Sequence, residues 1–192
     1  TGNYKYPMRV GESLQEMDDM TYRKIINEIE AEFSSKIVQN LHIQNLDKQA
    51  LTNLKKLWAK KSQRKDYLKL PNERMLRNIG LMTDKGLNYA CLILLGEKRQ
   101  IDELLPGSEI IFEWRQKVDK TAHDYRLNLR EPFFIIYDKI WEVINNRNLR
   151  FPFQEGFVQR EIWAFDEKST REAVLNAVAH RDYSIQDRSI FI

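Results

Sequence analysis

Apolar residues recur every three or four positions in several stretches of the chain, which is the spacing of one face of an α-helix. Asp18 and Asp19 are candidate N-caps for a first helix that runs to about Phe33, and Asp47 is a candidate N-cap for a second. Further helices are predicted over 72–79, over 89–95, from Pro132 to about 145, and from about Ser169 to His180.

Alternating apolar and polar residues predict strands between these helices. A strand over 4–10 ends at Gly11, and Pro7 favours an edge position for it. The Asp-Lys-Gly run at 84–86 predicts the turn of a small hairpin over 81–87. Other strands are predicted over 110–114, 126–129, 157–165 and from Arg188 onward.

These elements predict an α+β fold with a small mixed sheet. Helix, helix and hairpin follow one another over 47–96, an order that is compatible with a winged-helix-like part but is not specific for it. The Asn-rich stretch at 145–148 is a candidate boundary. The first residue is Thr1, and the last residues read as a strand that is just beginning, so we expect the chain to be a fragment of a longer protein.

Composition favours a soluble cytoplasmic protein. No apolar run approaches the roughly 20 residues that a membrane-spanning helix needs. Cys91, the single cysteine, lies inside an apolar run and reads as a buried thiol rather than part of a disulfide or metal site. The formal net charge of +3 is too close to neutral to imply a polyanionic partner by itself.

The distribution of charge is more informative than the total, because 48–65 contains basic residues and no acid. One reading is a DNA-binding surface, to which the predicted helix over 72–79 would add two arginines. The other reading is the solvated face of an amphipathic helix. The candidate DNA-binding residues are Lys55, Lys56, Lys60, Lys61, Arg64, Lys65, Arg74 and Arg77.

Polar residues recur at helical spacing near the C-terminal end of the chain. Glu172, Asn176 and His180 are each four residues apart, so we expect them to share one helix face. An amide and a carboxylate in this register can share a hydrated Mg²⁺ with a nucleotide. Alternatively, Glu172 closes a capping box with Ser169, and His180 is a cation at the helix C-terminus.

The run Arg171-Glu172-Ala173-Val174-Leu175-Asn176-Ala177-Val178-Ala179-His180-Arg181-Asp182-Tyr183-Ser184 closely resembles a signature of bacterial and archaeal transcriptional regulators, often labelled RecG-like ATP-dependent helicases. The stretch 80–96 is similar to a second part of that family. Asn88-Tyr89-Ala90-Cys91 and Leu95 depart from its usual pattern there.

The resemblance implies three segments. Residues 1–11 would be the last strand of an upstream Schlafen/AlbA-like domain, 12–148 a connecting α+β region, and 149–192 the truncated start of an ATPase-like α/β sandwich of the histidine-kinase, gyrase and Hsp90 type. Cofactors of the parent protein would be ATP and Mg²⁺, with none bound tightly by this fragment. We expect a homo-oligomer for the parent and no membrane partner.

The resemblance also assigns residues. Asn176 matches the position that contacts Mg²⁺ together with the nucleotide, and Glu172 matches the acidic, catalytic position. His180, Arg181 and Asp182 match the end of the motif without an assigned role. No phosphate loop of the Gly-x-x-x-x-Gly-Lys-Ser/Thr type is present in the sequence, which argues against a helicase motor.

Two functions follow from these observations. The first is a fragment of a DNA-binding transcriptional regulator with an incomplete ATP-binding-type module. The second is a connecting and dimerising scaffold of an ATPase-type switch protein that makes no direct contact with DNA. Neither reading makes this chain a complete enzyme.

Overall fold

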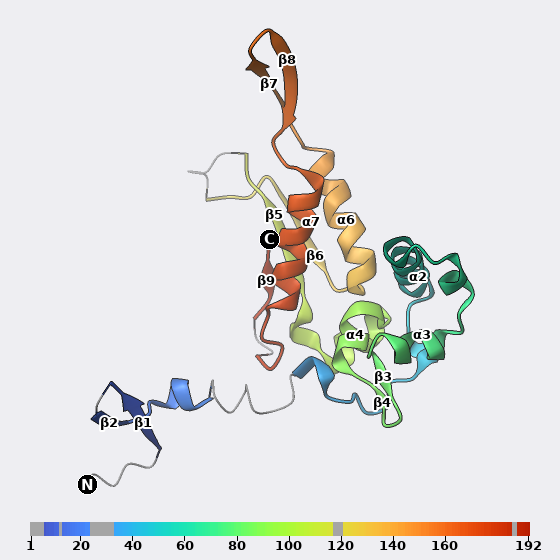
Figure 1. Ribbon diagram of the computed structural model, residues 1–192, viewed down its shortest axis with the longest axis vertical. Helices are drawn as coiled ribbons and strands as arrows, with labels where there is room; N and C mark the ends of the chain where they lie inside the picture. Colours follow the sequence, from blue (N-terminus) through green and yellow to red (C-terminus); the bar gives the residue numbers. More distant parts are fainter. Residues whose placement is uncertain (1–5, 12, 24–32, 117–120, 186–187) are drawn as a thin grey trace.

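The computed structural model describes residues 6–11, 13–23, 33–116, 121–185 and 188–192. Helices and a small sheet form the body, and a two-stranded hairpin lies at each end of the long axis (Figure 1). Within the described residues, no helix is long and apolar enough to cross a membrane.

The helices carry most of the core. Residues 19–23 are helical, and the rest of the first predicted helix, 24–32, lies outside the described residues. The later α-helices are α2 (Lys48–Ser62), α3 (Asn72–Asn78), α4 (Tyr89–Leu95), α5 (Lys98–Leu104), α6 (Phe133–Asn145) and α7 (Glu167–Ala179). Short 3-10 helices are η1 (Phe33–Ser35), η2 (Ile43–Asn45), η3 (Lys65–Lys69) and η4 (Pro106–Ser108).

In the described residues, the strands form three separate hairpins and one mixed sheet. The hairpins are β1 (Pro7–Val10) with β2 (Ser13–Glu16), β3 (Met82–Thr83) with β4 (Gly86–Leu87), and β7 (Arg150–Glu155) with β8 (Val158–Trp163). The mixed sheet has the order β6-β5-β9, with β5 (Ile110–Trp114), β6 (Tyr125–Leu129) and β9 (Ile190–Phe191).

The second predicted helix is confirmed as α2, and its cap is the expected one. Asp47 Oδ1 accepts a hydrogen bond of 2.7 Å from the backbone N–H of Ala50, which satisfies a free donor of the first turn. Leu51 and Leu54 are buried as the apolar stripe predicts. Leu57, predicted to belong to that stripe, is instead 43% exposed.

The predicted hairpin between α3 and α4 is also confirmed. Gly80 follows α3 with a φ of +75°, a conformation that lets the chain leave the helix without strain. Asn88 is buried, and its side-chain amide makes two hydrogen bonds. Nδ2 donates to the carbonyl of Gly80 at 2.8 Å, and Oδ1 accepts from the N–H of Cys91 at 3.0 Å. Asn88 therefore joins the end of α3 to the start of α4.

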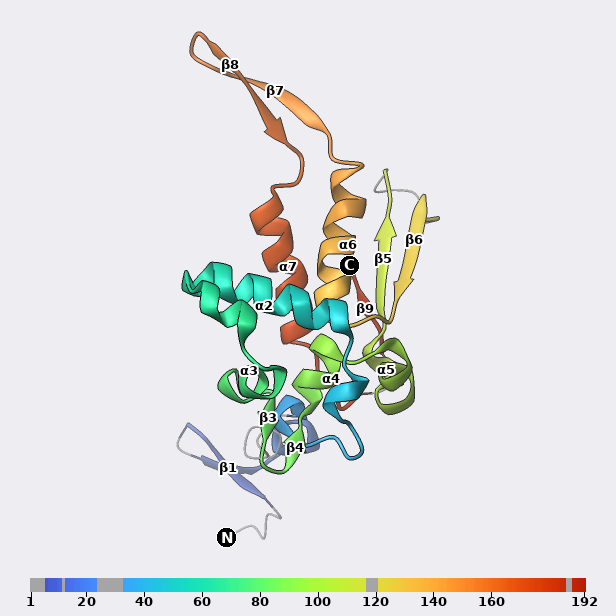
Figure 2. The same cartoon turned by 90° about the vertical axis from the view of Figure 1, so that its right-hand side faces the viewer.

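The predicted mixed sheet is confirmed, and it links distant parts of the chain. Ile110 of β5 pairs with Leu129 in an antiparallel ladder and with Ile190 in a parallel one. Figure 2 shows α6 and α7 side by side along this sheet, and Val174 and Val178 of α7 share one core cluster with it. The segments 12–148 and 149–192 thus pack into the same core, while their assignment to two domains remains a prediction.

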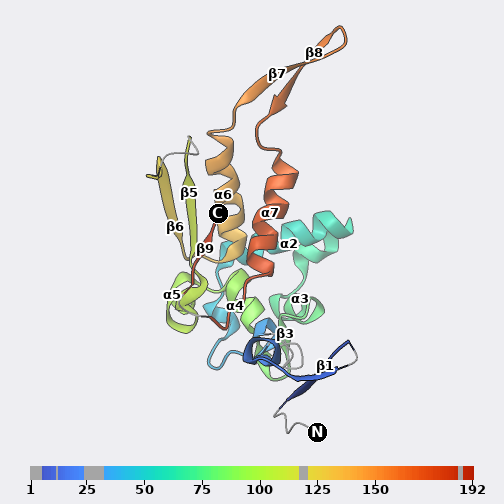
Figure 3. The ribbon, with the colours of Figure 1, turned by 90° about the vertical axis from the view of Figure 1, so that its left-hand side faces the viewer.

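Among the described α-helices and strands, three were not predicted from the sequence, and neither were the short 3-10 helices. β2 pairs with the expected strand β1, α5 follows α4, and β7 precedes the expected strand β8. Every residue of β7 and β8 is exposed, and Figure 3 shows this hairpin extending beyond the ends of α6 and α7. The alternation of apolar residues in β8 therefore reflects a two-faced ribbon rather than a strand of the core.

Candidate functional site

Helix α7 carries the predicted catalytic and nucleotide-binding residues, and its start differs from the prediction. Asp166 is the N-cap, since its Oδ2 accepts hydrogen bonds of 2.9 Å from both the backbone N–H and the hydroxyl of Ser169. The alternative reading of a capping box between Ser169 and Glu172 is therefore wrong. Glu172 lies inside the helix, and capping does not explain its presence.

The polar face of α7 points to solvent. Val174 and Val178 are buried against the core, whereas Glu172 and Asn176 are exposed on the helix and His180 is exposed as its C-cap residue. Leu175, predicted to face the core, is 41% exposed. Within the described residues, no group of three His, Cys, Asp or Glu could hold a metal ion by itself.

Arg171 fixes α7 against α6. Its Nη1 donates to Asp138 Oδ1 at 3.0 Å, and its Nε donates to Glu167 Oε1 at 2.8 Å. The guanidinium also lies 4.6 Å from the centre of the Tyr137 ring, a cation–π contact. Arg171 therefore sets the orientation of the polar face that Glu172 and Asn176 occupy.

The turn after α7 is built by its own side chains. The hydroxyl of Tyr183 donates to the carbonyl of Val178 at 3.0 Å, and burial raises the pKa of Tyr183 to about 12. Asp182 Oδ1 accepts from the N–H of Ser184 at 2.9 Å and from its hydroxyl at 2.5 Å, and these bonds lower the pKa of Asp182. The turn thus has a fixed shape.

Arg181 holds this turn to neighbouring segments. Its Nη2 donates to the carbonyl oxygens of Gly107 and Arg188, which places η4 and the approach to β9 around one guanidinium. Nη1 is buried and has no hydrogen-bond partner in the described part of the chain. Burial lowers the pKa of Arg181. These contacts give Arg181 a structural role, which the sequence left unassigned.

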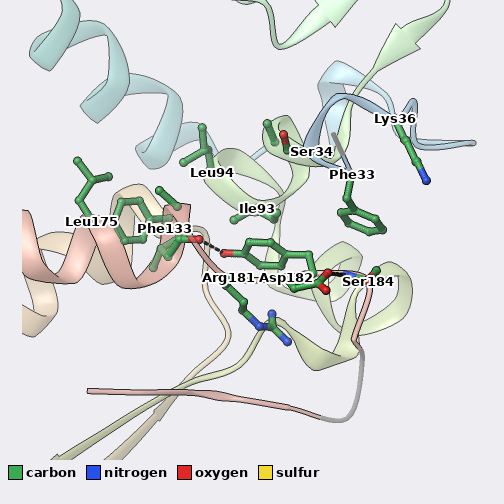
Figure 4. Close-up of a pocket in the computed structure, with 14 residues that line it drawn as sticks. Phe33, Ser34, Lys36, Ile93, Leu94, Phe133, Leu175, Arg181, Asp182 and Ser184 are labelled. Atoms are coloured by element: carbon green, nitrogen blue, oxygen red, sulfur yellow. Dashed lines mark hydrogen bonds between the residues drawn. The ribbon is translucent and has the colours of Figure 1, made fainter. Parts of the chain in front are cut away.

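A cavity of about 470 Å³ lies beside this turn, between η1, α4, the start of α6 and the end of α7. Figure 4 shows Leu175 and Phe133 toward one end, Ile93 between, and Asp182 with Ser184 toward the other. Its walls are mainly apolar, and Asp182 and Ser184 already bond to each other. The cavity therefore offers space and apolar contact.

The predicted site residues do not all meet at this cavity. Arg181 and Asp182 line it, whereas Glu172, Asn176 and His180 are not among its lining residues. Leu175 and Ala179 do line the cavity and are exposed, and they lie three residues after Glu172 and Asn176 respectively. Because residues three apart share a helix face, the polar face of α7 borders the cavity without lining it.

The predicted basic surface is only partly available. Lys55 Nζ donates to the carbonyl of Leu70 at 2.7 Å, so this residue ties α2 to the segment before α3. Arg64 pairs with Asp66 at 2.7 Å, and Arg77 pairs with Asp84 at 2.6 Å. Lys55, predicted to lie on the outward face or at the end of α2, is therefore half-buried, whereas Arg64 and Arg77 are exposed and each share their charge with a neighbouring carboxylate.

The remaining members of the predicted surface are exposed as well. Within the described residues they form no hydrogen bond or ion pair with another side chain, and α2 itself contains no acid. Lys60 and Lys61 also lie in the last turn of α2, where the helix dipole favours cations. The exposed set is Lys56, Lys60, Lys61, Lys65 and Arg74.

Sequence reasoning missed the residues that shape the site. Arg171 and Tyr183 were read only as parts of a motif, although each makes contacts that hold α7 in place. A local signal existed for Arg171, which lies four residues after Glu167. No local signal pointed to Phe33, because its place at the cavity depends on four separate segments.

Comparisons with known proteins add the fold but no activity. The model of a family described as a domain of unknown function (DUF8451) matches residues 23–111. No curated protein matches the chain. The chain is similar to the crystal structure of the DIP2311 protein from Corynebacterium diphtheriae, with a TM-score of 0.62 and 21% identity over 96% of this chain and 36% of that one. The chain thus spans about a third of the length of the solved protein, with which it shares its fold.

Proposed function

We propose that this chain is the connecting and DNA-contacting part of a transcriptional regulator. The observation that carries the proposal is the lysine-rich surface of α2, which contains no acid and has exposed Lys56, Lys60 and Lys61. Lys65 and Arg74 extend the exposed basic set to η3 and α3. Phosphates neutralised by such residues release counterions, and this release drives binding to DNA.

The local order of elements supports the same proposal. The β3–β4 hairpin follows α3, as a wing would follow the recognition helix of a winged-helix domain over 47–96. Lys85 is exposed in the turn of this hairpin. In this arrangement α3 would present Arg74 to DNA, and the hairpin would contact the neighbouring phosphates.

A matched pair of variants tests the proposal. Lys60→Ala/Lys61→Ala removes two adjacent exposed cations from α2, and Lys98→Ala/Arg99→Ala removes two from α5. Each is titrated with a duplex DNA at several salt concentrations. Each lost phosphate contact should lower the slope of log K against log salt by about 0.9. The α2 variant should therefore lose about 2 units of slope, and the α5 variant should keep the slope of the wild type.

Lys55 stays unchanged in this test because its bond to Leu70 holds α2 in place. Equal losses in both variants would mean that DNA responds only to net charge. Absence of binding by the wild type would contradict the proposal and favour the scaffold reading, in which the chain only connects and dimerises.

A second candidate function is a nucleotide-responsive switch on α7. It is favoured by the exposed Glu172 and Asn176, which lie one turn apart on a helix that Arg171 orients. An amide oxygen and a carboxylate fit a hydrated Mg²⁺ that a nucleotide mostly coordinates. Asn176 would hold that ion, and Glu172 would orient a water molecule. Bound Mg²⁺-ATP would supply the phosphoryl chemistry.

Titration calorimetry with Mg²⁺ and a non-hydrolysable ATP analogue tests this candidate on the natural full-length protein. Asn176→Ala should weaken binding at least tenfold, whereas Asn145→Ala, an exposed amide at the end of α6, should leave it unchanged. Equal affinity of the Asn176→Ala variant and the wild type would remove the nucleotide role from α7.

A further inference from the structure

The β7–β8 hairpin stands apart from the rest of the fold. Figure 1, Figure 2 and Figure 3 all show it extending beyond the ends of α6 and α7. Its base is fixed, since Asn148 Nδ2 donates to the carbonyl of Phe165 at 2.8 Å and Asn148 Oδ1 accepts from the N–H of Phe165 at 2.9 Å. The hairpin is therefore held outward by a defined stem.

The strand register gives the hairpin one apolar face. Phe151 pairs with Ile162, Phe153 with Arg160 and Glu155 with Val158, and cross-strand partners lie on the same side of a ribbon. The opposite side carries Gln154 paired with Gln159, Pro152 with Glu161, and Arg150 with Trp163. The Arg150 guanidinium lies 4.0 Å from the centre of the Trp163 ring. The face made by Phe151, Phe153, Val158 and Ile162 is called the apolar face below.

This apolar face has no cover in the described part of the chain. Phe151, Phe153 and Ile162 are 53%, 49% and 50% exposed, and Val158 is 56% exposed. A two-stranded hairpin without a packed face is at best marginally stable in water. Clustered apolar side chains on a projecting element mark an interaction surface.

The charges of the hairpin indicate the kind of partner. Arg150 pairs with Glu161 at 3.1 Å, and Arg160 pairs with Glu155 at 3.3 Å. The ribbon is therefore electrically balanced, which disfavours DNA, an anionic membrane surface and a strongly charged protein. A second copy presents an identical face, and Arg160 and Glu155, which the register places on the same side as the apolar residues, can exchange partners across a two-fold axis.

We infer that the apolar face of the hairpin packs against the same face of a second copy of this chain. Two such ribbons bury their apolar sides as the two layers of a small sandwich do. The contact rests on the apolar face of each copy, which is far fewer residues than the roughly 20–30 a side of a standard stable interface. The dimer is consequently reversible, with a dissociation constant in roughly the micromolar range.

Two double variants with the same incoming residue test this interface. Phe153→Thr/Ile162→Thr removes apolar side chains from the apolar face, and Gln154→Thr/Gln159→Thr changes neighbouring positions on the opposite face. Thr suits a strand in both cases. Sedimentation equilibrium over a range of concentrations should show a wild-type dimer, at least tenfold weaker association of the first variant, and association within twofold of wild type for the second.

A spin label locates the contact. Cys91 is buried and its thiol pKa is raised to about 12 by that burial, so a cysteine introduced by Gln159→Cys is the reactive one. Labels at position 159 should show dipolar coupling between copies, and Phe153→Thr/Ile162→Thr should abolish it. A dimer without this coupling would place the interface elsewhere and overturn the inference.

Thermal unfolding of every variant checks that the body is intact, which we expect because the hairpin contributes no residue to the core cluster. A wild-type chain that stays monomeric up to about 1 mM overturns the inference. So does a monomeric chain that sediments with vesicles of phosphatidylcholine and phosphatidylglycerol through the apolar face. The test does not depend on DNA or nucleotide binding.

Discussion

The hydroxyl of Tyr183 donates a hydrogen bond of 3.0 Å to the carbonyl of Val178, and this bond folds the turn after α7 back onto the helix. Both residues are buried and belong to the common core. The turn is therefore an anchored part of the fold, and the exposed polar face of α7 begins directly beside it.

Removal of this hydrogen bond should change the stability of the protein measurably at neutral and at alkaline pH. Tyr183→Phe should lower the free energy of unfolding by about 1 kcal/mol at pH 7. Burial raises the pKa of Tyr183 in the folded protein to about 12, above the ordinary tyrosine value of 10.0. The stability linked to this group is thus fully present below pH 10 and is lost as pH rises toward 12.

The Tyr183→Phe variant should accordingly lose less stability than the wild type between pH 10 and 12. Urea unfolding across that range gives both quantities. Tyr67→Phe, at a half-buried ring within η3 and far from the core turn after α7 in sequence, serves as a control and should retain the wild-type dependence of stability on pH. If all three proteins showed the same dependence of unfolding free energy on pH, the proposed role of the buried Tyr183 hydrogen bond would be wrong.

The N-cap of α7 should make the stability of the protein depend on pH in the acidic range. Hydrogen bonds from Ser169 lower the pKa of Asp166 below 3.8. The contribution of this group is therefore present above pH 3.8 and is lost as pH falls through the lower folded pKa. Asp166→Asn keeps a capping oxygen without titrating, so its unfolding midpoint should fall less between pH 5 and 2 than that of the wild type.

Circular dichroism during thermal unfolding measures that midpoint. Glu172→Gln removes a carboxylate from the same helix but leaves the cap in place. It should retain the acid dependence of the wild type. A parallel fall of the Asp166→Asn and wild-type curves would mean that the cap does not titrate.

The link between α6 and α7 should depend on the planar group of Arg171. Arg171→Lys removes the geometry that reaches Asp138, Glu167 and the Tyr137 ring together. We expect a loss of about 1 kcal/mol in the free energy of unfolding. Arg150→Lys changes a guanidinium that lies 4.0 Å from the Trp163 ring on the projecting hairpin, and it should leave global unfolding unchanged.

Gly96 should resist substitution for a steric reason. A Cβ at this position would lie 2.6 Å from the carbonyl oxygen of Leu92, and that oxygen belongs to the backbone of α4. Gly96→Ala should therefore cost about 1–3 kcal/mol in urea unfolding. Gly156→Ala meets no atom within 4 Å, so its cost should stay at the hairpin turn and leave the midpoint of the body unchanged.

The sequence predicted elements well where a local signal was strong. Asp47 before an apolar stripe led to α2, and the strand over 110–114 has the bounds of β5. α5 was missed because Ile101 is its only buried residue, so no stripe is visible. β7 was missed because Pro152 weakens its strand signal and its alternating side chains never reach the core.

The site was less predictable because its contacts cross the chain. The spacing of Glu172, Asn176 and His180 predicted a shared polar face, and all three are exposed. It could not indicate that Lys55 would bond to Leu70 or that Arg77 would pair with Asp84. Those pairings depend on how α2, α3 and the hairpin after α3 pack, which a linear charge pattern does not contain.

The parallel pairing of β5 with β9 has a consequence for how the chain folds. Ile110 pairs with Ile190, and the nearby bond from Ser189 to Glu109 joins residues 80 positions apart. Closing so long a loop costs entropy before any contact repays it, and contacts of this kind slow folding. During synthesis β5 and β6 can pair early, but β5 waits for its second neighbour until Ile190 has left the ribosome.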